Sequence, residues 1–362
     1  MSDSNWIPTP GSGAIALAKL QLALPSRMRL QQLVEFGGPV RSLLALYLVR
    51  LGMLHETTLR FDTGESIAVN KKSLDQQLLS DPRIWRARVS RLKRVATLVE
   101  SPGYVGARLD PRDFPGAGHA KSERPLEVGF WYETEAEWVN CVDSLTVHFL
   151  RRGRRGPGSY GYLNVRGRDV VDIGANIGDS ALYFAARGAK HVYAFEPFTQ
   201  TFHQAKRNIE RSPFAERITL LNEGCGDRHR IVRMDPTADG SLWSAVRGAD
   251  GEMGIQVSTL PEIVDRFGLM DAVLKSNCEG CEYPLLLSTS PKTRQAFAEM
   301  GLEYHFGCTE LVRLLRGDGF TTHHTSPVLF NNPYSPQPGV MLAGTVQAVR
   351  RPGVGGHPGS VR

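Results

Sequence analysis

Residues 169–178 read Asp-Val-Val-Asp-Ile-Gly-Ala-Asn-Ile-Gly, and this stretch decides the fold. Its apolar run ends in a glycine turn, and a helical pattern follows over residues 179–187. A second apolar run, residues 191–195, ends on the acid Glu196. A strand, a glycine turn, a helix, a strand and an acid in this order are typical of one nucleotide-binding βαβ unit.

The glycine spacing indicates which nucleotide the unit binds. Dinucleotide folds use G-x-G-x-x-G, because the pyrophosphate rests on a helix N-terminus. Here Gly174 and Gly178 flank Asn176, which stands where the second glycine would be. Glu196 follows at the end of the second strand, where a carboxylate accepts hydrogen bonds from both ribose hydroxyls. The turn Asp-x-Gly-x-Asn-x-Gly resembles the S-adenosylmethionine (SAM) sites of doubly wound methyltransferases, which have no phosphate to hold, so we expect SAM rather than NAD or FAD. Asp172 would accept from its amino group, directly or through water.

Downstream segments resemble the FkbM family of methyltransferases. Residues 273–283, Val-Leu-Lys-Ser-Asn-Cys-Glu-Gly-Cys-Glu-Tyr, resemble its L-K-x-D-x-E-G-x-E-Y signature. Residues 170–184 resemble its V-D-I-G-A-N-I-G opening, and residues 302–305 resemble its E-x-H strand end. The resemblance covers roughly residues 165–350. It implies an α/β fold with a doubly wound, mostly parallel, seven-stranded sheet of the Rossmann-like class I methyltransferase type, with SAM as cofactor.

The candidate site residues lie at predicted strand ends, where ligands bind in such sheets. The cofactor-binding candidates are Asp172, Gly174, Asn176, Gly178, Glu196, Pro197 and Asp227. The resemblance places the region of Asp227 near the adenine. The fourth strand delivers the segment from Asn277 to Glu282 and the fifth delivers His305, and both face the methyl donor.

These last residues are the catalytic candidates: His305, Glu279, Glu282 and Asn277. An alcohol acceptor must lose a proton, and His305 is the predicted base because histidine titrates near neutrality. Glu279 and Glu282 are expected to hold acceptor hydroxyls or to assist, although a helix-capping role for Glu279 stays open. Asn277 replaces the family's usual Asp and cannot act as a base.

The sequence therefore predicts a SAM-dependent O-methyltransferase acting on a hydroxylated small molecule, sugar or glycan. Three alternatives stay open: an RNA methyltransferase, a SAM-binding or nucleotide-binding module without turnover, and an NAD-dependent oxidoreductase. The net charge of +6 has local sources. Two clusters carry it: Arg83, Arg86, Arg88, Arg91, Lys93 and Arg94, and then Arg151, Arg152, Arg154 and Arg155. Such clusters bind phosphates or form solvated faces.

Five cysteines in 362 residues do not predict a disulfide framework, and a reducing cytoplasm is the expected compartment. Cys278-x-x-Cys281 and His305-x-x-Cys308 have the residue types of a Cys3His zinc set. The family resemblance implies a loop that needs no metal cysteines, so we expect no metal.

The chain, with 41% hydrophobic residues, is long enough for one large domain and an accessory region. We expect a loose tail over 1–12, a mostly helical accessory region with hairpins over 13–164, the SAM-dependent domain over 165–350 and a disordered tail over 351–362. Shorter expectations are a hairpin over 59–69, helix over 73–100, a loop over 101–125, an acidic helical stretch from Trp131, strands over 145–150 and 161–165, and a strand-rich insertion over 224–258. The apolar stretch 42–54 is too short to span a bilayer, and no transmembrane segment is expected.

Overall fold

The computed structural model describes residues 45, 48–49, 52–60, 66–70, 82–114, 125–150, 152–153, 156–157, 159–234, 253–330 and 341–351. They fall into two compact units. The amino-terminal unit lies within Pro10–Leu109 and Glu127–Leu150, and the sheet unit holds Asp110–Leu126 and the described residues from Arg152 onward. The predicted boundary at residue 165 falls inside the sheet unit. Both predicted tails, apart from Arg351, and the helices expected before residue 45 lie outside the described residues.

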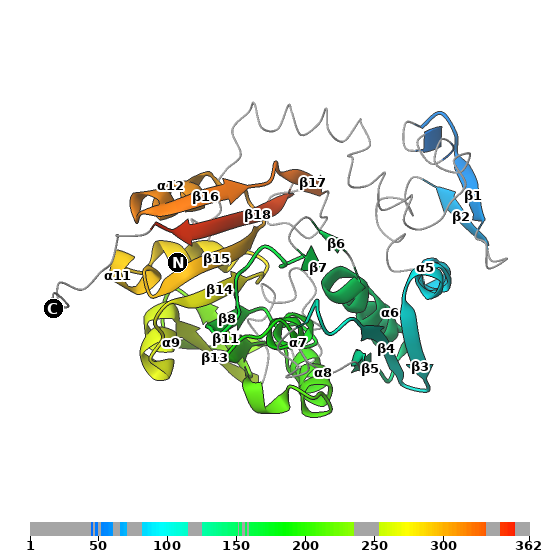
Figure 1. Cartoon of the computed structure of the whole chain (residues 1–362). Helices are drawn as coiled ribbons and strands as arrows, with labels where there is room; N and C mark the ends of the chain where they lie inside the picture. Colours follow the sequence, from blue (N-terminus) through cyan, green and yellow to red (C-terminus); the bar gives the residue numbers. More distant parts are fainter. Residues whose placement is uncertain are drawn as a thin grey trace. The chain divides into compact units, whose positions relative to one another are not determined.

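The sheet unit is built on one large sheet (Figure 1). Its strands are β8 (Asp169–Ile173), β9 (His191–Phe195), β10 (Ile218–Leu221), β14 (Ala272–Ser276), β15 (Phe297–Tyr304), β16 (Phe320–His324) and β18 (Met341–Arg350). They lie in the order β10-β9-β8-β14-β15-β18-β16. The first five are parallel, and β18 runs antiparallel to β15 and β16. This confirms the predicted mostly parallel seven-stranded sheet; the short β17 (Val328–Phe330) adds to β18.

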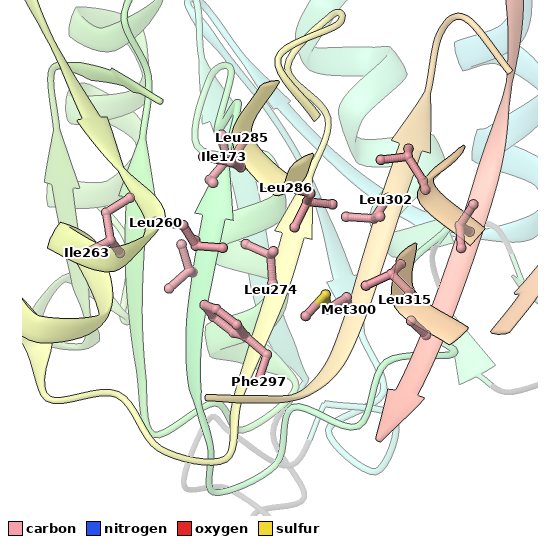
Figure 2. Packing of buried hydrophobic residues seen from close by; sticks show 14 of the residues in the cluster. Ile173, Leu260, Ile263, Leu274, Leu285, Leu286, Phe297, Met300, Leu302 and Leu315 are labelled. Carbon is pink, nitrogen blue, oxygen red and sulfur yellow. The ribbon is translucent and has the colours of Figure 1, made fainter. Parts of the chain in front are cut away.

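Helices alternate with the strands as the apolar periodicity predicts. They are α7 (Asp179–Ala186), α8 (Thr199–Glu210), α9 (Leu260–Phe267), α10 (Glu282–Leu287), the short α11 (Pro291–Arg294) and α12 (Thr309–Gly317). A 3-10 turn, η5 (Ala215–Arg217), precedes β10. The core in Figure 2 packs apolar side chains of α9, α10 and α12, such as Leu260, Leu285 and Leu315, against strand residues such as Leu274 and Leu302.

Alternation along the two central strands sends charged residues away from this core. In β8, Val171 and Ile173 belong to the core, so Asp172 between them points to the opposite face. In β14, Leu274 belongs to the core, so Lys275 points to that opposite face as well. The two strands are paired with Asp172 beside Lys275, and α7 packs against β8. A buried acid and a buried base are therefore brought together by sheet geometry.

A small second sheet follows β10. Its strands are β11 (Glu223–Gly226), β12 (Arg230–Met234) and β13 (Met253–Thr259), in the order β11-β13-β12. This confirms the strand-rich character of the predicted insertion over its described residues.

In the amino-terminal unit, β1 (Glu56–Arg60) and β2 (Ser66–Asn70) pair antiparallel, which confirms the predicted hairpin. Helix α5 (Pro82–Val95) is followed by a three-stranded sheet of β3 (Thr97–Ser101), β4 (Tyr104–Leu109) and β5 (Leu126–Trp131). Helix α6 (Glu135–Ser144) then begins at Thr134, whose hydroxyl accepts from the Glu137 amide at 3.1 Å.

Four expectations in this part of the chain were wrong. The helix predicted to residue 100 ends at Val95, and the loop predicted over 101–125 contains β4. The predicted strand over 145–150 is a π-helix, η4 (Leu145–Leu150), that continues α6, because α6 has no stop signal at its end. The predicted strand over 161–165 is a turn. Within the second arginine cluster, β6 (Arg152–Gly153) pairs with β7 (Gly156–Pro157). The other arginines of this cluster lie outside the described residues. None of the described helices is long and apolar enough to cross a membrane.

Candidate functional site

A cavity of about 410 Å³ opens at the carboxyl ends of β8, β9 and β14, where the topology predicts a ligand site. The small sheet closes one side of it. Its lining comprises Ile173, Gly174, Asn176, Phe195, Glu196, Pro197, Phe198, Thr201, Glu223, Gly224, Cys225, Arg230, Val232, Ile255, Val257, Asn277, Cys278, Glu279 and Cys281.

The glycine turn after β8 packs tightly against the segment after β14. Gly174 has φ +75°, and a Cβ there would lie 1.9 Å from the carbonyl oxygen of Asn277. The Asn277 amide in turn donates to the Ile173 carbonyl at 3.0 Å. Asn176 also takes a left-handed conformation, with φ 48°. Gly174 thus lines the cavity, and backbone-to-backbone approach requires it to be glycine.

Glu196 lies at the end of β9 and is almost fully buried. Its two carboxylate oxygens accept from the amides of Asn176 at 2.8 Å and Phe198 at 3.0 Å. Burial raises the pKa of Glu196 to about 7, although the hydrogen bonds from the two backbone amides lower the pKa. The second strand therefore delivers its acid to the cavity, as the sequence predicts, with each oxygen keeping room for a further donor.

Asp172 does not line the cavity. Its carboxylate lies 2.8 Å from the ammonium of Lys275 and accepts from the Ser180 hydroxyl at 2.7 Å. Lys275 also donates to the carbonyl of Gly174 at 2.6 Å. Burial raises the pKa of Asp172 against the opposing effect of Lys275. This ion pair, buried beneath the glycine turn, supports the turn through Lys275, while the contact of Asp172 with the amino group of SAM stays a prediction.

The acceptor side is formed by two glutamates and a histidine. His305, which follows β15, places Nε2 3.1 Å from Glu279 and Nδ1 3.2 Å from Glu282. Glu282 is fully buried and also accepts from the Cys278 amide at 3.0 Å. Glu279, with φ 57°, keeps 33% of its side chain exposed and lines the cavity. The three groups predicted from separate strand ends do converge.

His305, the predicted base, lies between the carboxylates of Glu279 and Glu282. Burial lowers the pKa of His305, but the charges and hydrogen bonds of Glu282 and Glu279 outweigh it and hold the pKa well above its ordinary value. An imidazolium has no free lone pair and cannot accept a proton. His305 is also absent from the cavity lining, so Glu279 is the group of this cluster that reaches the cavity.

Six of the eleven predicted site residues line the cavity: Gly174, Asn176, Glu196, Pro197, Asn277 and Glu279. Gly178 instead lies at the start of α7. Asp227 forms an ion pair with Arg230 at 2.5 Å, and Arg230 rather than Asp227 lines the cavity. The apolar wall of Val232, Ile255 and Val257 was not predicted. The alternating pattern of residues 253–259 indicated a strand there. The pattern did not indicate what the two faces of that strand would contact.

Cys278 and Cys281 form a disulfide, which the cysteine count did not predict. The turn between them brings their Cα atoms to 5.4 Å, within the usual range for a disulfide. Sulfurs bonded to one another carry no thiolate, so the Cys3His zinc set weighed from the sequence is incompatible with this state.

Comparisons with known proteins found a family match over part of the sheet unit. The methyltransferase FkbM domain matches residues 172–316. A 77-residue stretch is 49% identical to uncharacterized protein 65 of Sulfolobus islandicus filamentous virus; it covers 20% of this chain and 47% of the viral protein. Among solved structures, the methyltransferase FkbM from Methylobacillus flagellatus KT is 18% identical, with a TM-score of 0.34, 51% of this chain and 45% of that chain covered. A precorrin-6y C5,15-methyltransferase from Geobacter metallireducens GS-15 is 12% identical, with a TM-score of 0.31, 52% of this chain and 82% of that chain covered.

The chain thus spans about half the length of the viral relative and of the Methylobacillus protein. The domain match begins at Asp172 in β8 and ends at Arg316 in α12, so it includes the glycine turn, Glu196 and the loop from Asn277 to Glu282. Residues 172–316 form a SAM-dependent methyltransferase domain of the FkbM family.

Proposed function

We propose that this domain methylates a hydroxyl oxygen of a small polyhydroxylated molecule, a sugar or glycan included, with SAM bound in the cavity. The observation that carries the proposal is the position of Glu279. It lines the cavity that Glu196 also lines, and its carboxylate is held by the buried His305 at 3.1 Å. A carboxylate held in this way is suited to binding and deprotonating a hydroxyl group.

The residues that line the cavity support SAM as its ligand. Glu196 supports the ribose, since each of its oxygens accepts one amide and retains a lone pair for a hydroxyl. Val232, Ile255 and Val257 offer an apolar surface for a purine ring. Asn277 Oδ1 is buried at the cavity wall and has no hydrogen-bond partner within the described residues, so it can accept from a ligand donor. When bound, SAM supplies a methyl group on a sulfonium, which a nucleophile takes by in-line displacement.

The residues of the acceptor side divide the remaining work. Glu279 accepts the hydroxyl proton while the acceptor oxygen attacks. His305, as an imidazolium, holds the carboxylate of Glu279 in place, and Glu282 balances the charge of His305 from its buried side. In this arrangement His305 is a positioning residue, and the role predicted for it passes to Glu279. Asn277 then need not act as a base.

In the α5 cluster, the three basic residues whose side chains the structure describes give no support to RNA as the acceptor. In the amino-terminal unit, Arg86 pairs with Glu135 at 2.7 Å and Lys93 pairs with Glu100. Arg83 donates to the carbonyl oxygen of Ser66 at 3.3 Å. These cations are already engaged by neighbours, which favours the solvated-face interpretation of the α5 cluster.

The proposal is tested by offering methyl-labelled SAM with a panel of polyhydroxylated small molecules, oligosaccharides and RNA. Label is expected in an ether stable to mild base, on a small molecule or glycan. Glu279→Gln should retain SAH affinity and lose transfer by about 10²–10⁴-fold, the usual contribution of a general base. Glu310→Gln, an exposed change at the start of α12, is the control and should transfer normally. Label only in RNA, or full transfer by Glu279→Gln, contradicts the proposal.

A further inference from the structure

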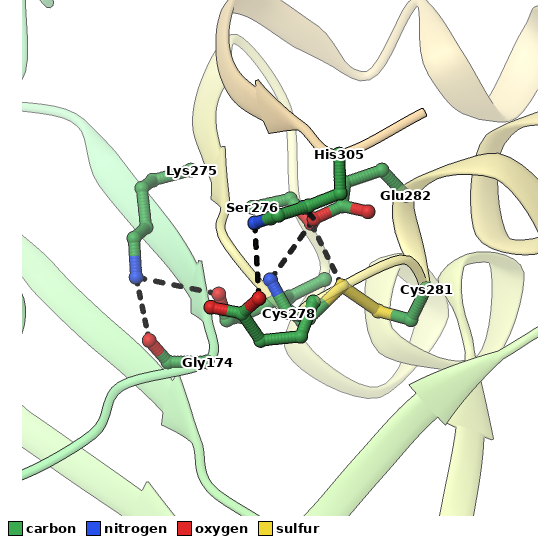
Figure 3. The surroundings of a disulfide bond; sticks show 9 residues. Gly174, Lys275, Ser276, Cys278, Cys281, Glu282 and His305 are labelled. Carbon is green, nitrogen blue, oxygen red and sulfur yellow. Dashed lines mark hydrogen bonds and ion pairs between the residues drawn. A yellow bond between two sulfur atoms is a disulfide. The ribbon is translucent and has the colours of Figure 1, made fainter. Parts of the chain in front are cut away.

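The loop between β14 and α10 carries a bonded cysteine pair in the wall of the cavity (Figure 3). Cys278 and Cys281 both line the cavity and are only partly buried. Cys225 also reaches the cavity wall, but its thiol is free. A pair of sulfurs open to a ligand cavity is chemically accessible, unlike a disulfide enclosed in an apolar core.

The pair encloses the two residues of the loop that have unusual backbone angles. Glu279 has φ 57° and Gly280 has φ 114°. A non-glycine residue in the left-handed region is disfavoured by roughly 1 kcal/mol or more, so something must hold Glu279 there. The backbone bond from the Cys281 amide to the Cys278 carbonyl is long, at 3.4 Å. The disulfide is therefore the main closure of this turn, and the turn aims Glu279 at His305.

We propose that Cys278 and Cys281 are a redox-active pair whose closed form positions Glu279 for methyl transfer and whose open form releases it. The part that concerns transfer rests on the proposed function of Glu279. The reactants are low-molecular-weight thiols and disulfides, which reach the sulfurs through the cavity. Because SAM occupies that cavity, bound cofactor shields the pair from them.

The exchange balances without another redox partner. A thiolate attacks one sulfur of the Cys278–Cys281 bond, forms a mixed disulfide, and releases the other cysteine as a thiolate that takes up a proton. A second thiol molecule attacks the mixed disulfide and frees the first cysteine. Two small thiols become one small disulfide, and the protein gains two electrons and two protons. Oxidation by a small disulfide is the reverse.

Opening the pair is expected to leave the fold intact. The neighbouring bonds of the loop do not involve sulfur: Glu282 accepts from the Cys278 amide, and Asn277 donates to Ile173. What changes is the turn at Glu279 and Gly280, and with it one wall of the cavity. Constraining so short a loop has a modest entropic effect, so affinity for SAH should fall by roughly 3- to 20-fold on reduction.

The test uses the full chain treated with oxidised or reduced glutathione, then alkylated and analysed by peptide mass spectrometry. Oxidised glutathione should protect Cys278 and Cys281 from alkylation, whereas Cys308 should react in both states once unfolded. SAH should slow the reduction of the pair at least about five-fold, and NAD should not. Calorimetry should show tighter SAH binding to the oxidised chain.

Variants separate this proposal from the proposed function. A Cys278→Ser and Cys281→Ser double variant should show the weaker affinity in both glutathione conditions, and Cys308→Ser should behave like the unaltered chain. Thiols at 278 and 281 that stay unpaired in oxidised glutathione overturn the redox pair. So does a disulfide whose state changes neither SAH affinity nor its own protection by SAH. The two proposals can also separate. If the pair closes, is shielded by SAH and tightens SAH binding, but the chain transfers no methyl group, the redox pair is supported and the proposed function is rejected.

Discussion

Glu196 is the residue on which cofactor binding depends most, and its surroundings set a clear pH dependence. Its pKa is raised by burial from 4.5 to about 7. Between these values the folded chain binds more protons at this site than the unfolded chain. The free energy of unfolding therefore falls as pH rises through this window.

The first prediction follows from this decrease of the free energy of unfolding with rising pH. Between pH 5 and pH 8, the contribution of Glu196 to the free energy of unfolding should fall by on the order of 2–3 kcal/mol in the absence of ligand. Glu196→Gln should remove this change, and Glu310→Gln should keep it, as urea unfolding at the two pH values would show. Ribose hydroxyls favour the carboxylate, so SAM affinity should rise with pH up to about 7. Identical pH profiles for Glu196→Gln and the unaltered chain would mean that the acid is not buried as described.

His305 gives the second prediction, because it is a buried cation between two acids. His305→Ala leaves the fully buried Glu282 without its charge partner, and such a loss costs about 3–5 kcal/mol. Adding Glu282→Gln should restore part of the lost free energy of unfolding, since the unpaired charge is then removed. His323→Ala, an exposed change on β16, should alter stability by less than about 0.5 kcal/mol. A His305→Ala loss as small as that of His323→Ala would show that the cluster carries no buried charge.

His305 also contributes to the pH dependence of stability. Its folded pKa is raised, so its stabilising effect is full below the ordinary histidine value and is lost as pH rises through the higher folded value. Unfolding measured as pH rises past the ordinary histidine range should therefore show a decline in stability that His305→Ala lacks.

Single residues also show where reasoning from sequence stops. Glu196 was predicted because its place at a strand end is a local feature. The charge of His305 was not, because it depends on Glu279 and Glu282 reaching it from another strand end. Asp172 was assigned to the cofactor although strand alternation turns it to the face where Lys275 lies. The face of the sheet on which Asp172 lies followed from the sequence, whereas its ion pair with Lys275 did not.

At the scale of elements, the glycine turn after β8 is the clearest case of a sequence requirement. Gly174 needs a positive φ and also has no space for a Cβ, since Asn277 lies against it. Gly167 offers a matched comparison: its φ is +71°, but nothing lies within 4 Å of its added Cβ.

The third prediction uses that pair. Gly167→Ala should lower the free energy of unfolding by about 1–2 kcal/mol, the cost of the left-handed conformation alone. Gly174→Ala should cost more and should abolish SAH binding, because the turn must move away from the segment after β14. Circular dichroism, urea unfolding and calorimetry on both variants would separate the effects. Intact SAH binding by Gly174→Ala would show that the turn does not shape the cavity.

Some elements have strong end signals of their own. In helix α9, Thr259 and Glu262 form a capping box, and Gly268 ends the helix in a left-handed conformation. The apolar run over 145–150 was misassigned, since six apolar-rich residues fit a strand or a helix equally well. The strand β4 was missed because glycine-rich sequence favours a loop. Gly106 is nevertheless required there, since the backbone carbonyl oxygen of Val128 would lie 2.8 Å from its Cβ.

At the scale of the whole molecule, the fold of the sheet unit was predictable because each strand, turn and helix carries its own periodic signal. The mostly parallel, seven-stranded character of its sheet followed from the family resemblance. The cavity wall formed by β12 and β13 did not, because it depends on how the small sheet packs, which no local pattern encodes. The amino-terminal unit lacks such a repeating pattern, and most of the wrong expectations fall in or beside it.

The central claim is that the cavity at the ends of β8, β9 and β14 binds SAM, and calorimetric titration of the full chain with SAM, SAH and NAD tests it most directly. We expect one site per chain for SAM and for SAH and no binding of NAD. Glu196→Ala should weaken SAM binding by about 1–3 kcal/mol, because the ribose hydroxyls lose their charged acceptor. Glu310→Gln should bind as the unaltered chain does. Binding of NAD without SAM, or unchanged SAM affinity in Glu196→Ala, would contradict the account.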